Sequence, residues 1–183
     1  GIIYILIIFM IMISFFSSNT IMSAENENQR ELNGDKLTME AIEDKENEYK
    51  ILAKGNALLK YNGMTISGEK AEFNTVESSI LFTGDVRFKS TDYIIKGKEL
   101  SGNVDKEKFT ITGNTLFKSN EIEANADKII YDMTEEMAYL EGNVKGKQND
   151  RKFSAEKISI DLKKEKIELS GKAKLIFPDR GEE

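Results

Sequence analysis

Five glycines recur at a constant interval of 29 residues: Gly55, Gly84, Gly113, Gly142 and Gly171. The letters around them repeat too, as in KGNALLK at 54–60, TGDVRFK at 83–89 and TGNTLFK at 112–118. Self-similarity with a period of 20–50 residues marks a fold that stacks one supersecondary unit many times. This period constrains the fold more than any other feature of the sequence.

Two further columns keep the same period. Asn or Asp opens a polar segment in each repeat, and such residues favour turns because their side chains bond nearby backbone groups. Small residues followed by two charged residues form the other column. Each repeat is therefore predicted to hold two strands joined by an Asx turn. The two columns are Asn74, Asn103, Asp132 and Asp161, and Gly68, Gly97, Ala126 and Ala155.

Apolar and polar residues alternate through the glycine without interruption, from Ile80 to Phe88, as in a strand with one buried face. In the preceding segment the alternation slips by one residue at the charged pair, as a β-bulge would cause. A strand of about ten residues spans roughly 33 Å, and a glycine at its midpoint permits a sharp bend. We expect all strands to bend at one level, folding the sheet into two facing halves. The alternative, hairpin turns at the glycines, fits the unbroken alternation less well.

The predicted fold class is all-β, an open, V-shaped antiparallel β-jellyroll built from 29-residue two-strand repeats. The jellyroll is expected over residues 37–177, with a flexible leader at 25–36 and a tail at 178–183. Residues 2–16 are almost wholly apolar, and small polar residues follow them. This pattern predicts that residues 1–24 are a cleaved signal peptide or an uncleaved membrane anchor, and that the remainder is exported.

The composition argues against catalysis. The chain has no Cys and no His, which removes thiol nucleophiles, the usual general base and the commonest metal ligand. Its 32 acidic residues outnumber 26 basic ones, which argues against a nucleic-acid partner. We therefore expect no enzyme, no catalytic residues, no metal and no cofactor.

Lysines form another column with the 29-residue period: Lys60, Lys89, Lys118 and Lys147. One hypothesis is a basic rail that contacts lipid phosphates or carboxylates. The other is that these lysines are solvated strand ends that protect the sheet from aggregation. Acidic residues are abundant nearby and favour the second hypothesis.

The last repeat runs through Ile176 and Phe177 to Pro178, and no capping helix is predicted after it. An uncapped edge can add a strand from another domain. We therefore expect end-to-end strand addition, either in a head-to-tail homo-oligomer or with related domains. The alternative is a disordered tail that covers this edge.

The segments ISGEKAEFNTVESSILFTGDVRFK and IEANADKIIYDMTEEMAYLEGNVK resemble the repeat of the lipopolysaccharide-transport periplasmic β-jellyroll family (LptA/OstA-like). The resemblance extends over about residues 37–177. It implies a periplasmic carrier or bridge that binds the acyl chains of lipopolysaccharide or a related glycolipid. It also implies end-to-end association with other β-jellyroll transport proteins, toward the outer membrane. The alternatives are an LptC-like component anchored in the inner membrane and a structural β-solenoid scaffold without ligand.

The resemblance implies that the inward-facing apolar side chains bind lipid in a trough. A sealed core, filled from both half-sheets, is the simpler alternative. We favour the trough, because no helix is predicted to cover so long an apolar surface. The predicted lipid-binding residues are Ile66, Phe73, Ile80, Phe82, Val86, Phe88, Leu100, Phe109, Ile111, Phe117, Ile129, Tyr131, Leu140, Val144, Ile158, Ile160, Ile167, Leu169 and Leu175.

Overall fold

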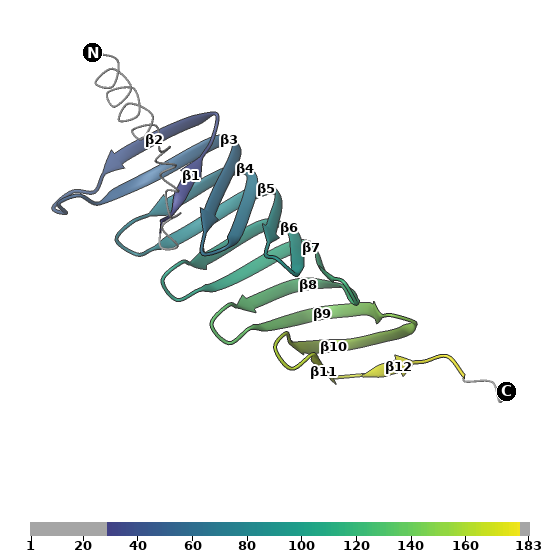
Figure 1. The fold of residues 1–183 in the computed structure, drawn as a ribbon. Coiled ribbons are helices and arrows are strands. Elements are labelled where there is room, and N and C mark those ends of the chain that lie inside the picture. The colour runs from purple at the N-terminus through teal and green to yellow at the C-terminus, as the bar shows by residue number, and fades with distance from the viewer. Residues whose placement is uncertain (1–28, 180–183) are drawn as a thin grey trace, which may run out of the picture.

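A computed structural model describes residues 29–179; the predicted signal peptide or anchor at 1–24 and residues 180–183 of the tail lie outside the described residues. Twelve strands form one open antiparallel sheet and follow one another along a single long axis (Figure 1). The predicted all-β jellyroll architecture is confirmed. The strands are β1 (Glu31–Asn33), β2 (Lys36–Ala41), β3 (Tyr49–Tyr61), β4 (Met64–Asn74), β5 (Ser79–Lys89), β6 (Tyr93–Asn103), β7 (Lys108–Ser119), β8 (Ile122–Asp132), β9 (Met137–Gln148), β10 (Arg151–Asp161), β11 (Lys166–Ser170) and β12 (Lys174–Ile176).

Strands β3 to β10 lie in sequence order, each paired with the next. At one end of the sheet, β1 and β2 both pair with β3, and at the other end β11 and β12 both pair with β10. Each pair of short strands therefore takes the place of one bent strand. Among residues 29–179, the structure contains no helix of the length and hydrophobicity that spanning a bilayer requires.

The strands bend where the sequence places Gly followed by Asn or Asp. Gly84 and Asp85 have φ of 78° and 43°, and Gly142 and Asn143 have φ of 80° and 49°. Gly adopts this left-handed region freely, and Asn and Asp tolerate it. The register shifts here, because residues 84 and 85 lie opposite residue 98 alone. The predicted bend is confirmed. The bulge predicted at the charged pair is wrong in its strand, because the extra residue belongs to the strand that carries the glycine and the charged pair lies opposite it.

A charged side chain of the neighbouring strand lies over each of these glycines. A Cβ on Gly142 would lie 2.3 Å from Asp127 Oδ2, and a Cβ on Gly84 would lie 2.5 Å from Glu69 Oε2. Asn143 Nδ2 also donates a hydrogen bond to Asp127 Oδ2 at 2.9 Å. The glycine is thus required both for the backbone conformation and for space. We call this line the crease: Gly55, Gly84, Gly113, Gly142 and Gly171, with Asp35, Glu69, Lys98, Asp127 and Glu156 above them.

The first repeat begins earlier than the sequence predicted. Asp35 N donates to Gly55 O at 2.8 Å, and Asn56 Nδ2 donates to the Asp35 carboxylate at 3.0 Å. The paired residues Lys36 and Lys54 are 18 positions apart (54 − 36), whereas the corresponding pair in the next hairpin is 13 apart (83 − 70). These five additional residues displace the first copy from the 29-residue period. Residues 31–36, assigned above to a flexible leader, therefore belong to the sheet: they form β1, the bend at Gly34 and Asp35, and the first residue of β2.

The crease divides the sheet into two half-sheets. Half-sheet A contains the strand segments beside the Asx turns at 75–78, 104–107, 133–136 and 162–165, together with β2 and β11. Half-sheet B contains the segments beside the turns at 62–63, 90–92, 120–121 and 149–150, together with β1 and β12. The predicted Asx turns are present, since Asn103 Oδ1 accepts from Lys106 N at 2.8 Å and Asp161 Oδ1 accepts from Lys164 N at 2.8 Å.

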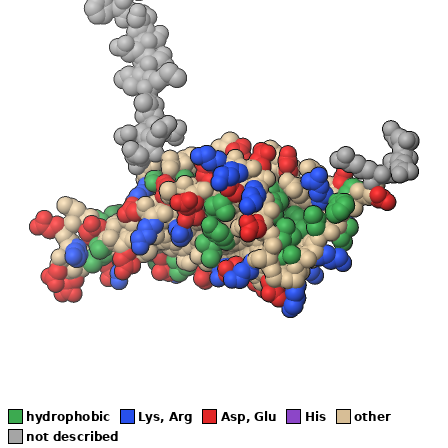
Figure 2. All heavy atoms as spheres, turned by 90° about the horizontal axis from the view of Figure 1, so that it is seen from below, with side chains coloured by type: hydrophobic (Ala, Val, Ile, Leu, Met, Phe, Trp, Pro, Cys, Tyr) green, Lys and Arg blue, Asp and Glu red, His purple; other side chains and the backbone are tan. Residues whose placement is uncertain are grey.

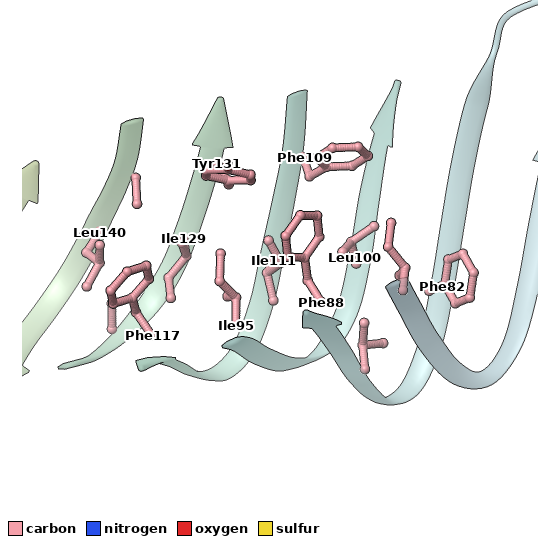
Figure 3. Packing of buried hydrophobic residues seen from close by; sticks show 14 of the residues in the cluster. Phe82, Phe88, Ile95, Leu100, Phe109, Ile111, Phe117, Ile129, Tyr131 and Leu140 are labelled. Carbon is pink, nitrogen blue, oxygen red and sulfur yellow. The ribbon is translucent and has the colours of Figure 1, made fainter. Parts of the chain in front are cut away.

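The hydrophobic core lies between the two half-sheets and is drawn entirely from residues 53–160 (Figure 3). Half-buried side chains such as Leu32 and Leu169 extend it to both ends of the sheet. Residues 31–176 thus contain the whole sheet and its core, and they form one folding unit.

We predict that Gly142→Ala lowers the free energy of unfolding by about 2–3 kcal/mol, because Ala is strained at positive φ and its Cβ displaces Asp127. Gly63→Ala is the matched control. Gly63 has a φ of 72°, but a Cβ there would meet nothing within 4 Å. The control should cost only about 1 kcal/mol. Urea unfolding measures both values, and equal losses would contradict the steric role of the crease.

Candidate functional site

The predicted lipid-binding residues lie on the inner surface of the folded sheet, and most are fully buried. Of the nineteen, Phe73, Ile167 and Leu169 are half-buried, and Leu175 is 51% exposed. Each of the other fifteen is at most 4% exposed. Lipid binding by these residues stays a prediction.

Side chains of the two half-sheets fill the space between them (Figure 3). Phe88 of half-sheet B lies 5.6 Å from Phe109 and 5.2 Å from Tyr131, both of half-sheet A, measured between ring centroids. The inner surface is therefore packed against itself rather than hollow. Away from the rows of turns, this surface becomes accessible only if the half-sheets separate.

Several inner residues were not predicted from the sequence, although they follow the same 29-residue period. Ile95, Ala124 and Phe153 stand at 29-residue intervals after Ile66, and all of them are buried. Met64 and Ile122 are also buried, two residues before members of that column. The alternation of apolar and polar residues in the strands that lack the Gly–Asx pair could have identified them.

A cleft of about 630 Å³ runs along the edge opposite the crease, between the two rows of turns. We call it the mouth cleft. Apolar side chains, including Met64, Phe88, Ile122 and Met133, line it. On the space-filling surface, hydrophobic side chains gather in patches between charged ones (Figure 2). The charged residues that line the mouth cleft are all acidic: Asp92, Glu107, Glu121, Glu136, Asp161 and Glu165.

Polar contacts join the two half-sheets across the mouth. The hydroxyl of Tyr93, in half-sheet B, hydrogen-bonds to the hydroxyl of Tyr131, in half-sheet A. Asn62 Nδ2 donates to Glu107 Oε1 at 3.1 Å. These contacts hold the half-sheets together at the edge opposite the crease.

The pKa values of the two tyrosine hydroxyls in this contact are raised. Burial raises the pKa of the Tyr131 hydroxyl, and its hydrogen bond with Tyr93 raises it further. Burial also raises the pKa of Tyr93, and the nearby carboxylates of Glu136 and Asp92 add to the shift. The pKa values of both hydroxyls therefore lie above the usual value of a tyrosine side chain.

The inner surface continues uncovered to both ends of the sheet. At one end, Leu37 and Met39 of β2 pair with Ala53 and Ile51 on the inner face and are 50% and 60% exposed. At the other end, Leu175 of β12 pairs with Phe153. Leu37 and Met39 lie in half-sheet A, and Leu175 lies in half-sheet B. The two ends thus expose apolar surface on opposite half-sheets.

In the part of the chain that the structure describes, no group of three or more acidic side chains is arranged to hold a metal ion. All buried side-chain nitrogen and oxygen atoms among these residues have a hydrogen-bond partner. For example, Thr115 Oγ1 donates to Ala126 O at 2.7 Å. The interior therefore offers apolar surface rather than polar groups to a ligand.

The folded repeat sheet, with its apolar interior, has the architecture of an open β-jellyroll. The model of the family described as LptA/(LptD N-terminal domain) LPS transport protein matches residues 65–166. This match spans 102 of the 183 residues (166 − 65 + 1), more than half of the chain. The chain belongs to this family, and the resemblance noted in its sequence is confirmed.

A solved structure supports the fold. The crystal structure of LptH from Pseudomonas aeruginosa is described as that of the LptA homologous periplasmic component of the conserved lipopolysaccharide transport device. It matches with a TM-score of 0.61 and 17% sequence identity, over 63% of this chain and 95% of the LptH chain. At this identity the likeness shows the fold alone. No curated protein matches the sequence.

We predict that the cost of Tyr131→Phe depends on pH. Near pH 8 the free energy of unfolding should fall by about 1 kcal/mol, the net contribution of a hydrogen bond. Above about pH 10 the unfolded wild type ionises Tyr131 while the folded state keeps it neutral, so the wild type loses up to about 1.4 kcal/mol per pH unit that the variant does not lose. Urea unfolding measures the difference in the free energy of unfolding between the wild type and the variant. This difference should be smaller near pH 11 than near pH 8, or change sign. A constant difference would contradict the raised pKa of Tyr131.

Proposed function

We propose that this protein is a periplasmic carrier that holds the acyl chains of lipopolysaccharide, or of a related glycolipid, along the inner surface of its folded sheet. The observation that carries the proposal is the continuous apolar inner surface, which reaches the mouth cleft and both ends of the sheet. Membership of a lipopolysaccharide-transport family supports the same ligand class.

The proposed mechanism is an exchange of apolar contacts. Each acyl CH₂ that leaves water for the interior contributes about 0.8 kcal/mol. Separating the half-sheets breaks pairings such as Phe88 with Phe109, but the acyl chains replace these contacts with their own. The hydrogen bonds across the mouth cost only about 1 kcal/mol each to break. Separation of the half-sheets therefore costs little net free energy when acyl chains fill the space between them.

The inner surface gives no direction to transport. Its residues are generic hydrophobes along the whole sheet, and similar side chains line each successive repeat. Net movement then requires partners that supply lipid at one end and remove it at the other. We propose that other β-jellyroll transport proteins are these partners.

Contact with such partners is proposed at the ends of the sheet. The edges formed by β1 and β2 and by β11 and β12 have unpaired backbone groups that can add a strand. The exposed apolar residues lie on half-sheet A at one end and on half-sheet B at the other. Head-to-tail stacking would place these two surfaces against each other and cover both. The same geometry permits a homo-oligomer or a mixed assembly.

Photo-cross-linking tests the binding surface. A benzophenone amino acid at Met133 or Leu162, which line the mouth cleft, should capture lipopolysaccharide on irradiation. The same group at Tyr139, which is 39% exposed on the outer face, is the matched control and should capture none. Labelling at Tyr139 alone, or at none of the three positions, would exclude the carrier and favour the ligand-free scaffold.

The end-to-end contact is tested by the double variant Leu175→Lys/Phe177→Lys. These side chains are 51% and 66% exposed, so the fold should persist, whereas association should weaken by about tenfold or more because charged groups would be buried at the joint. Sedimentation over a range of protein concentrations, alone and with partner domains, measures the effect. Tyr139→Lys on the outer face is the control. Equal association of all three proteins would contradict stacking through this end.

A further inference from the structure

The outer face of half-sheet B is strongly basic, although the whole chain has a net charge of −6. Its outward side chains form two continuous rows across the strands, and the only carboxylates among them are Glu31 and Glu123. The basic residues, all exposed, define what we call the basic face: Lys60, Arg87, Lys89, Lys96, Lys118, Lys145, Lys147, Lys152 and Lys174.

Most of these cations have no internal partner. Within residues 29–179, only Lys60 and Lys118 of the basic face form ion pairs, with Glu31 at 3.5 Å and Glu123 at 3.2 Å. The outer face of half-sheet A differs. There Lys and Glu or Asp are interspersed and form pairs between neighbouring strands, such as Lys128 with Glu141 at 2.6 Å. The basic face therefore has a large unbalanced positive charge that the other half-sheet lacks.

Like charges lie directly opposite each other on the basic face. Arg87 of β5 is the cross-strand partner of Lys96 of β6, and such pairs destabilise a sheet. Protection of a sheet edge does not explain this pair, since β5 and β6 are interior strands. That explanation fits only the cations on or beside an edge strand: Lys174 of β12, Lys152 of β10 and Lys60 of β3. The interior cations point to an anionic partner outside the protein.

The form of the basic face indicates what that partner is. The cations are single charges on flexible side chains, spread over an open sheet surface, and apolar Ile94 and Leu116 stand between them. This arrangement suits a surface with many mobile anions, and each Lys or Arg near an anionic bilayer contributes about 1 kcal/mol. Neighbouring strands rotate by roughly 20°, so only a few strands can face one plane. Strands β5 to β7 hold four cations within three strands: Arg87, Lys89, Lys96 and Lys118.

We propose that the basic face, centred on β5 to β7, docks this protein on the surface of a bilayer that contains anionic phospholipids. The inference does not depend on lipid binding between the half-sheets. Docking through the outer face of half-sheet B leaves the mouth cleft and both ends of the sheet free. A docked molecule would therefore keep its proposed sites of lipid entry and of stacking accessible.

Flotation with lipid vesicles tests the proposal. Residues 25–183 are used, because they contain the whole folding unit and lack the apolar N-terminal segment. Vesicles of phosphatidylcholine with about 30% phosphatidylglycerol are compared with pure phosphatidylcholine, at about 50 and about 300 mM salt. We expect binding to the anionic vesicles only, and weaker binding at the higher salt.

Two variants of equal net charge distinguish binding through the basic face from a general effect of the protein's net charge. Arg87→Gln/Lys89→Gln/Lys96→Gln/Lys118→Gln should lower the vesicle partition constant by at least about tenfold. The control, Lys50→Gln/Lys54→Gln/Lys157→Gln/Lys166→Gln, removes four exposed lysines from the outer face of half-sheet A and should stay within about twofold of the wild type. Circular dichroism melts confirm that both fold. Absence of wild-type binding, equal losses in the two variants or equal binding to neutral vesicles would overturn the proposal.

Discussion

The crease determines the shape of the whole sheet. At each crossing, a glycine with positive φ lies beneath a charged side chain of the next strand, as Gly142 lies beneath Asp127. Because each of the strands β3 to β10 bends at this level, one sheet becomes two facing half-sheets. The inner surface, the mouth cleft and the uncovered ends all follow from that bend. The charged side chain above each glycine is exposed to solvent at the crease, and the interior between the half-sheets stays apolar.

Much of this arrangement was predictable from the 29-residue period. The period located the two strands of each repeat, the Asx turns and the bend at Gly–Asx, because each depends on local sequence. The start of the first repeat was predicted too late, because five extra residues in its hairpin move Gly34 and Asp35 out of the 29-residue period. These two residues nevertheless have the pattern of a small residue followed by a charged one that marks the other repeats. The degree of burial was not predictable. It depends on the angle between half-sheets, which long-range contacts such as Tyr93 with Tyr131, 38 residues apart, help to set.

The charges divide the molecule into surfaces with different roles. Only acidic charged residues line the mouth cleft, the outer face of half-sheet A balances its charges, and the outer face of half-sheet B is basic. Alternation along each strand produces this division, since Arg87 and Lys89 point outward on either side of the inward Phe88. A single strand thus contributes both to the proposed lipid-binding interior and to the proposed membrane-docking exterior. The Lys column seen in the sequence was one row of this larger face.

We propose that the interior accepts lipid although its two half-sheets are packed against each other in this structure. The most direct test is native mass spectrometry with lipid analysis of residues 25–183, purified without detergent from the envelope of a lipopolysaccharide-producing cell. The account predicts stoichiometric lipopolysaccharide or another acylated glycolipid bound to the protein. A stable, lipid-free protein that also fails to take up added lipopolysaccharide would contradict it, and would make the folded sheet a scaffold.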